Sequence, residues 1–267
     1  MNAPMPENIH LKYPVVLVHG IIAHDRRSLI KYWGRIPEIL TGKGIKVFRG
    51  NTDAWGKYQS NALILKKTIE NVLSQTGSKR VNIIAHSKGG IDSRYLIWKH
   101  FFGDKIASLT TICTPHHGSE IADLLFNKKI IHKRYIRKIL SIFGGLYGDA
   151  NPNLCKLIYQ MTTAKMKEFN EKITMDKNVF YQSLYTTMDD SSVHKMFSYT
   201  YSKIKEISGE NDGLVSENSA KWGNNINKIE GGISHAEILD YKGKNISGVN
   251  IPGIYVKIAK ELNNNNF

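Results

Sequence analysis

The sequence predicts an α/β protein, with a mainly parallel central sheet covered by helices on both faces. Short apolar runs of strand character alternate with longer segments in which apolar residues recur at helical spacing. The chain has 267 residues, 41% of them hydrophobic and 22% charged, which is the composition of one large globular domain. We therefore expect a single domain over residues 1–267, with its ligand crevice at the carboxyl ends of the strands.

Each expected element has its own sequence signal. Continuous apolar or β-branched runs predict strands at Tyr13–Val18, Ile45–Phe48, Val81–Ala85, Ala107–Cys113, Val179–Tyr185 and Ile226–Ile229. Apolar stripes predict helices over about 28–40, 59–75 and 88–101, and from about Pro252 onwards. Pro37 is expected to kink the first helix, and Gly213 suggests that Asp212 stands at a turn after another strand.

The central motif is the stretch Val81–Gly90, in which an apolar strand runs through Ser87 directly into a helix. A serine at a sharp strand-to-helix bend is the nucleophile elbow of the α/β-hydrolase fold. The bend brings backbones close together, so the positions two before and two after the serine must be small. Here they are Ala85 and Gly89, and Ser87 is the expected nucleophile.

A serine nucleophile needs a base, and the base needs an acid that fixes its tautomer. The order serine, acid, histidine along the chain is satisfied by Ser87, Asp212 and His235. Asp189 and Asp190 are competing acids, because both follow the strand that ends at Tyr185.

Other histidines are weaker candidates for the base. The side chain of His86 is expected to point away from the cleft. His116 and His117 precede any suitable acid, and His19 is expected to order the loop that follows the first strand.

Stabilisation of a tetrahedral oxyanion requires two backbone N–H donors. We expect the N–H of Lys88, at the start of the helix after the serine, and the N–H of Ile21, just after His19 and Gly20.

An insertion of about residues 119–172 interrupts the alternation of strands and helices. It is long, helical and basic, and its place after a strand end predicts a helical lid above the crevice.

The net charge of +14 favours anionic partners, either a lipid–water interface or an anionic membrane surface. Nucleic acid is not expected, because the chain has no recognised binding motif. Met1–His10 has neither the basic nor the apolar region of a secretory signal. We therefore expect a cytoplasmic protein, or a secreted one if a leader is missing from this sequence.

Five blocks in family order resemble the bacterial triacylglycerol lipases of the true-lipase group. They are Tyr13–Gly20 (YPVVLVHG), Tyr32–Pro37 (YWGRIP), Ala85–Gly90 (AHSKGG), Thr114–Ser119 (TPHHGS) and Asn211–Val215 (NDGLV). The resemblance implies an α/β-hydrolase fold, ester hydrolysis and a helical lid. It also favours Asp212 as the acid and matches His235 to the family histidine.

The resemblance further implies a calcium site in many relatives, at positions that here hold Asp189-Asp190 and Glu237. Asp190 and Glu237 are therefore the candidate calcium ligands. The histidines of the zinc-binding insertion found in some relatives are missing after Trp55, so zinc is not expected. The chemistry itself requires no cofactor.

The expected function is hydrolysis of carboxylic esters through an acyl-enzyme, with triacylglycerols as substrates. A carboxylesterase acting on short soluble esters or polyesters is the alternative. A non-catalytic lipid-binding protein on the same scaffold is a third hypothesis, which the presence of serine, aspartate and histidine disfavours.

Overall fold

The structure is a computed structural model that describes residues 8–21, 31–127, 149–150, 152–189, 196–246 and 248–267. Six strands form one parallel sheet in the order β2-β1-β3-β4-β5-β6. They are β1 Val15–Val18, β2 Val47–Arg49, β3 Val81–His86, β4 Ile106–Ile112, β5 Phe180–Thr186 and β6 Ile226–Ile229. The predicted α/β class with a parallel sheet is confirmed.

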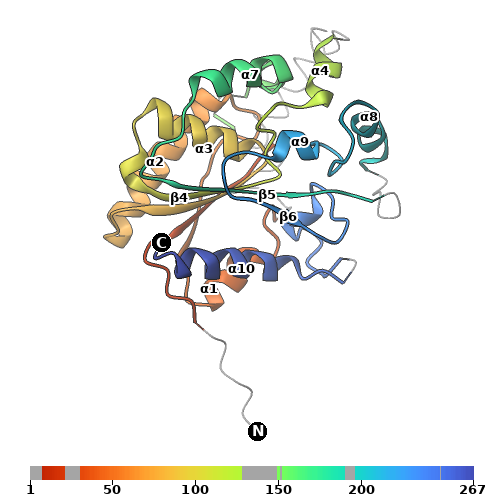
Figure 1. Cartoon of the computed structure of the whole chain (residues 1–267). Coiled ribbons are helices and arrows are strands. Elements are labelled where there is room, and N and C mark those ends of the chain that lie inside the picture. The colour runs from red at the N-terminus through yellow and green to blue at the C-terminus, as the bar shows by residue number, and fades with distance from the viewer. Residues whose placement is uncertain (1–7, 22–30, 128–148, 151, 190–195, 247) are drawn as a thin grey trace.

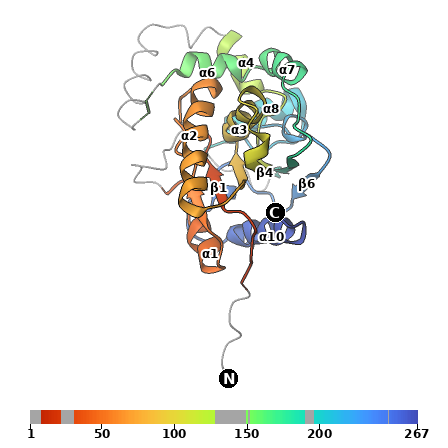
Figure 2. The same cartoon turned by 90° about the vertical axis from the view of Figure 1, so that its left-hand side faces the viewer.

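Helices cover both faces of the sheet (Figures 1 and 2). Helices α1 (Ile36–Gly42) and α10 (Ile251–Asn264) lie against one face, and α2 (Tyr58–Thr76) and α3 (Lys88–Lys99) against the other. In β1, Val15 and Leu17 belong to the apolar core on the side of α1 and α10, whereas Val16 and Val18 belong to the core on the side of α2 and α3. Alternate side chains point to opposite faces of a strand, so a continuous apolar run is what a sheet buried on both sides requires.

The remaining helices lie in the segments between and after the later strands. They are α4 Glu120–Asn127, α6 Leu154–Gln160, α7 Thr163–Lys172, α8 Ser198–Ser208 and α9 Glu217–Ala220, with short 3₁₀ turns at η1 Gly103–Lys105 and η3 Glu237–Leu239. Helices α4, α6 and α7 share an apolar cluster with Ile91 of α3. Within the described residues, no helix has the length and apolar character needed to cross a membrane.

Two expectations about elements are wrong. In the described part of the predicted 28–40 helix, residues 32–35 form turns and α1 begins at Ile36, with Pro37 in its first turn. Proline is favoured there, because the first turn needs no N–H donor from it. The segment before Asp212 is helix α8 and not a strand: Tyr201 and Ile204, three residues apart, are buried on one face.

Candidate active site

The backbone at Ser87 forms the expected sharp bend. Strand β3 ends at His86 and helix α3 begins at Lys88, while Ser87 has φ 54° and ψ −130°. A positive φ is unfavourable for a residue with a Cβ atom, so surrounding contacts must hold it. A Cβ atom on Gly89 would lie 2.6 Å from the carbonyl oxygens of Val18 and His19. Glycine is therefore required for α3 to approach β1 this closely.

Ser87, His235 and Asp212 lie in a hydrogen-bonded line. His235 Nδ1 donates to Asp212 Oδ2 at 2.7 Å, and Ser87 Oγ lies 3.0 Å from His235 Nε2. An ionised carboxylate only accepts, so the proton of a neutral imidazole resides on Nδ1 and Nε2 can accept from the serine hydroxyl. All three residues are buried. The arrangement has the geometry of a serine nucleophile, its base and an orienting acid.

The loop around Asp212 holds the carboxylate in place. Asp212 Oδ1 accepts the backbone N–H groups of Leu214 and Val215 at 2.9 and 2.8 Å, which leaves Oδ2 for the imidazole. The backbone N–H of His235 donates to the Asp212 carbonyl at 2.8 Å. The acid and the base are thus fixed to each other through both side chain and backbone.

His86 has a role that the sequence did not reveal. The Tyr32 hydroxyl accepts the Gly20 N–H at 2.7 Å and donates to His86 Nδ1 at 2.7 Å, and His86 Nε2 donates to the His235 carbonyl at 3.1 Å. This buried chain of bonds links the loop after β1 to the backbone of His235. The expectation that the His86 side chain points away from the cleft is wrong, because His86 lines one of the cavities beside Ser87. It is still not the base, because both of its ring nitrogens are engaged.

We expect Tyr32→Phe to lower kcat about tenfold with little change in KM, because the oxyanion loop and His235 lose a shared anchor. It should also lower the free energy of unfolding by about 1–3 kcal/mol, since two buried polar groups lose their partner. Steady-state kinetics on a soluble ester and chemical denaturation measure both effects. The exposed Tyr199→Phe is the matched control, and equal behaviour of the two variants would contradict the anchoring role.

The ring nitrogens of the other candidate histidines contact groups other than Ser87. His19 is buried, and its ring nitrogens lie 2.8 and 2.9 Å from the carbonyl oxygens of Gly20 and Thr52, as expected for a residue that orders this loop. His116 Nδ1 accepts from Arg94 Nη1 at 3.1 Å, and its Nε2 donates to Thr111 Oγ1 at 2.9 Å. His117 donates to the Lys221 carbonyl at 3.1 Å. Of the alternative acids, Asp189 is exposed and Asp190 lies outside the described residues.

Burial holds the pKa of His86 and of His116 well below 6.5, with nearby cationic or histidine groups adding to the effect. In the unfolded chain both imidazoles bind protons below about pH 6.5, whereas the folded chain keeps them neutral. The stabilisation is therefore complete above that pH and declines as the pH falls, by about 1.4 kcal/mol per pH unit for each histidine. The free energy of unfolding, measured with urea at several pH values between about 6.5 and about 5, should fall less steeply with decreasing pH for His116→Gln than for the parent. An unchanged slope would contradict this assignment.

The block Tyr32–Pro37 braces the segment that follows His235. Arg35 donates through Nε and Nη2 to both carboxylate oxygens of Asp240, at 2.8 and 2.7 Å, and its backbone N–H adds a third bond at 2.8 Å. A Cβ atom on Gly34, whose φ is +48°, would lie 2.1 Å from the Asp240 carbonyl oxygen. The sequence marks this block only through its family resemblance, because its partners are about 200 residues away.

The two expected oxyanion donors lie beside Ser87. Lys88 is the first residue of α3, so its N–H has no acceptor within the helix. Ile21 lines the cleft next to Ser87. The hydrogen bond from the Gly20 N–H to the Tyr32 hydroxyl holds the backbone just before Ile21. The side chain of Lys88 points elsewhere, donating to buried Asp92 at 2.6 Å.

Ser87 stands where two apolar cavities meet. One, of about 130 Å³, extends under helices α4 and α6; the other, of about 210 Å³, extends toward Tyr32, Phe197 and Leu239. Ile21, Ser87, Leu214 and His235 line both. A substrate with apolar groups on each side of its reacting carbon could place one group in each cavity.

The contacts of Glu237 do not suit a calcium ligand. Its Oε2 accepts from the Ser234 hydroxyl at 2.7 Å, and the Lys242 ammonium lies 3.0 Å from Oε1, where a cation would sit. Burial acts to raise the pKa of Glu237, but hydrogen bonds from Ser234 and Lys242 outweigh it and hold the pKa below its usual value. The second candidate ligand, Asp190, lies outside the described residues.

Cys113, Asp212 and His235 place one donor atom each within 4.8 Å of one another. Asp212 and His235 bind each other here, and burial beside Asp212 raises the pKa of the Cys113 thiol well above its usual value. Metal binding needs a thiolate, so this cluster does not fit a metal.

Comparison with known proteins places this geometry in a family. Residues 14–194 match the family model described as palmitoyl protein thioesterase. Triacylglycerol lipase 2 of Saccharomyces cerevisiae is 33% identical over 225 residues, which cover 80% of this chain and 64% of the relative. A triacylglycerol lipase of Pseudomonas fragi is 36% identical over 121 residues, covering 45% of this chain and 41% of the relative. The chain thus spans less than two thirds of the length of these relatives.

Solved structures share the fold at low sequence identity. A Bacillus licheniformis lipase in its mature form superposes with a TM-score of 0.69 at 22% identity, covering 96% of each chain. A metagenomic carboxyl esterase superposes with a TM-score of 0.79 at 16% identity, covering 98% of this chain and 79% of the esterase. The fold, the elbow and the family match agree: the chain is an α/β-hydrolase that belongs to the palmitoyl protein thioesterase family.

Proposed function

We propose that the chain is a serine hydrolase that cleaves carboxylic esters, with triacylglycerols as its main substrates. The observation that carries this proposal is the line Ser87–His235–Asp212, with bonds of 3.0 and 2.7 Å, at the meeting point of two apolar cavities. The names of the lipase relatives support the substrate class.

The geometry supports an acyl-enzyme mechanism. His235 Nε2 takes the Ser87 proton as Oγ attacks the ester carbonyl carbon, and the carbonyl oxygen becomes an oxyanion that the N–H groups of Ile21 and Lys88 receive. His235 then gives the proton to the leaving alcohol oxygen as the carbon–oxygen bond breaks. Asp212 remains a carboxylate throughout and stabilises the imidazolium.

The second half of the reaction uses the same groups. His235 removes a proton from water, the hydroxide attacks the acyl carbon, and the same two N–H groups hold the second oxyanion. Collapse releases the carboxylic acid and returns the proton to Ser87 Oγ. Every proton transfer is accounted for by Ser87 and His235, so the steps call on no cofactor.

Helices α4, α6 and α7 lie in the proposed lid of about residues 119–172, of which residues 128–148 and 151 are outside the described part of the chain. Leu125 of α4 and Leu157 of α6 line the smaller cavity, so movement of this segment would change access to Ser87. The net charge of +14 favours action at a lipid–water interface or an anionic membrane surface.

Two other activities differ from this proposal in substrate. A carboxylesterase would prefer short soluble esters or polyesters. The matching family is described as palmitoyl protein thioesterase, so acyl thioesters are a further substrate class to assay. Ser87 could attack a thioester carbonyl by the same steps. A non-catalytic lipid-binding protein would hydrolyse none of these.

Chain-length profiling distinguishes these functions. Rates are measured on p-nitrophenyl esters from acetate to palmitate, on emulsified trioleoylglycerol and on palmitoyl-coenzyme A, with Ser87→Ala as the blank. The proposal predicts a preference for long acyl esters and a rise in rate when an emulsion forms. A steep preference for acetate without interfacial activation would support the esterase instead, and exclusive thioester cleavage would support the thioesterase.

A further inference from the structure

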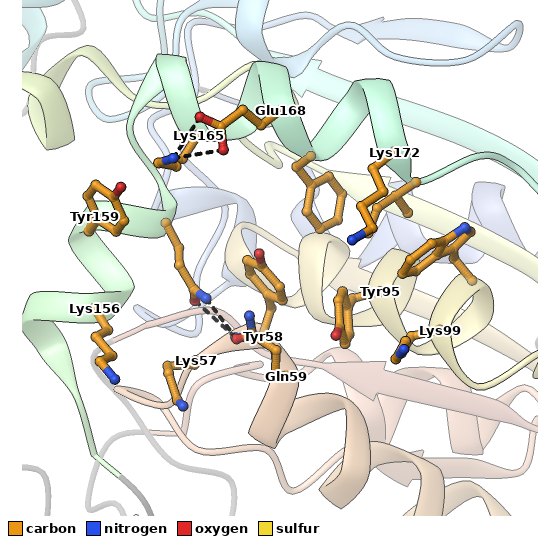
Figure 3. A pocket seen from close by; sticks show the side chains of 14 residues that line it. Lys57, Tyr58, Gln59, Tyr95, Lys99, Lys156, Tyr159, Lys165, Glu168 and Lys172 are labelled. Atoms are coloured by element: carbon orange, nitrogen blue, oxygen red, sulfur yellow. Dashed lines mark hydrogen bonds and ion pairs between the residues drawn. The ribbon is translucent and has the colours of Figure 1, made fainter.

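A second cleft lies on the side of helix α6 that faces away from Ser87. It has a volume of about 520 Å³ and opens between α6 and α7 on one side and the ends of α2 and α3 on the other (Figure 3). Helix α6 forms part of both sites. Leu157 and Ile158 line the cavity beside Ser87, whereas Lys156 and Tyr159 line the cleft.

The rim of the cleft is strongly basic. Five lysines line it, and they come from four separate segments: Lys57, Lys99, Lys156, Lys165 and Lys172. Among the lining residues, all in the described part of the chain, the single acidic side chain is Glu168, and it pairs with Lys165 at 2.6 Å. The lining therefore carries a net charge of about +4, from five lysines and one glutamate.

The floor of the cleft is aromatic. The ring centre of Tyr58 lies 4.8 Å from that of Tyr95 and 5.3 Å from that of Phe169, and Tyr95 lies 6.1 Å from Trp98. The ammonium groups of Lys99 and Lys172 lie 5.9 and 5.7 Å from the centre of the Trp98 indole. Two like charges held near one ring repel each other, so an anion in the cleft would be attracted to both.

We propose that this cleft binds the phosphate headgroup of an anionic phospholipid. The lysine rim complements the phosphate, and the aromatic floor complements the glycerol and the upper acyl carbons, as aromatic side chains do at membrane interfaces. The choice of a lipid over other phosphate-bearing molecules rests on the proposed function. Because α6 also walls the cavity beside Ser87, a lipid bound here would hold the lid segment at the membrane surface.

The test measures binding separately from catalysis. Ser87→Ala protein, which cannot turn over lipid, is sedimented with vesicles of phosphatidylcholine alone and of phosphatidylcholine mixed with phosphatidylglycerol. The cleft variant is K57Q/K99Q/K156Q/K172Q. The matched control is K46Q/K79Q/K244Q/K257Q, which removes the same charge from exposed lysines outside the cleft lining.

The cleft variant should bind the mixed vesicles about 600-fold more weakly, since each of the four lysines at an anionic surface contributes roughly fivefold in affinity. The control should lose far less. Equal losses in the two variants would show that net charge alone drives binding, and no loss in the cleft variant would exclude the site. Either result overturns the proposal.

Three further measurements identify the ligand and separate the two proposals. Brominated phosphatidylglycerol should quench the tryptophan fluorescence of the parent more than that of Trp98→Phe, because Trp98 lies on the floor of the cleft. Tight binding of soluble glycerol 3-phosphate or of a single-stranded oligonucleotide, lost in the cleft variant while vesicles bind to neither protein, would overturn the lipid assignment. On the Ser87 background the cleft variant should hydrolyse a soluble short ester at the parent rate, so failure of vesicle binding leaves the catalytic proposal standing.

Discussion

Ser87→Ala is expected to lower the kcat of ester hydrolysis by about 10⁵- to 10⁶-fold, to the rate that the oxyanion hole and substrate binding alone can supply. The variant removes the one atom that forms the acyl-enzyme, and His235 then has no nucleophile to deprotonate. Rates are measured on a chromogenic ester in excess over the enzyme, where a pre-steady-state burst of alcohol release from the parent should disappear in the variant.

The loss must come from chemistry and not from unfolding. Ser87 is small and its hydroxyl bonds to His235, so the alanine variant should keep its thermal midpoint within a few degrees. Ser202→Ala, at an exposed serine of α8, is the matched control and should retain full activity. Residual turnover above about 1% of the parent would contradict the assignment of Ser87.

Asp212→Asn should lower kcat by about 10⁴-fold while leaving the fold intact. The Asn amide can donate to His235 Nδ1, which favours the tautomer with its proton on Nε2. That tautomer cannot accept the Ser87 proton, so the nucleophile is no longer activated. Activity should recover partly at high pH, where hydroxide can deprotonate the serine without help.

Asp189→Asn and Asp190→Asn are the matched controls for the choice of acid. Both aspartates were candidates in the sequence, but Asp189 is exposed and the carboxylate bound to His235 belongs to Asp212. Each control should retain most of the activity. A large loss of activity in either control, with near-normal activity in Asp212→Asn, would show that the catalytic acid lies in the loop after β5 and is not Asp212.

Local sequence signals predict the fold well, because the sheet is buried on both faces. Val15 to Val18 alternate between two cores, so the strand shows as an unbroken apolar run. The elbow also has a local signature: a strand, a serine, close-packed glycines and a helix. Chain order and family resemblance then select Asp212 and His235, which the structure brings to hydrogen-bond distance.

The features that the sequence does not predict depend on contacts between segments that are distant in the chain. The anchor formed by Tyr32 and His86 joins residues 54 apart, and neither residue type reveals its partner in the sequence. The glycine after Asp212 suggests a turn at the end of a strand, but Tyr201 and Ile204 are buried at helical spacing, and the segment forms helix α8. The cleft beside α7 gathers lysines from four segments, and no local pattern in any one of them indicates that they meet.

The role of Ser87 as the nucleophile of an ester hydrolase can be tested by covalent labelling. Labelling with a fluorescent alkyl phosphonate, followed by mass spectrometry of the modified peptide, tests it most directly. We expect one phosphonate on Ser87, loss of ester hydrolysis in proportion to labelling, and no labelling of Ser87→Ala. Modification of another residue, or ester hydrolysis that persists in fully labelled protein, would contradict it.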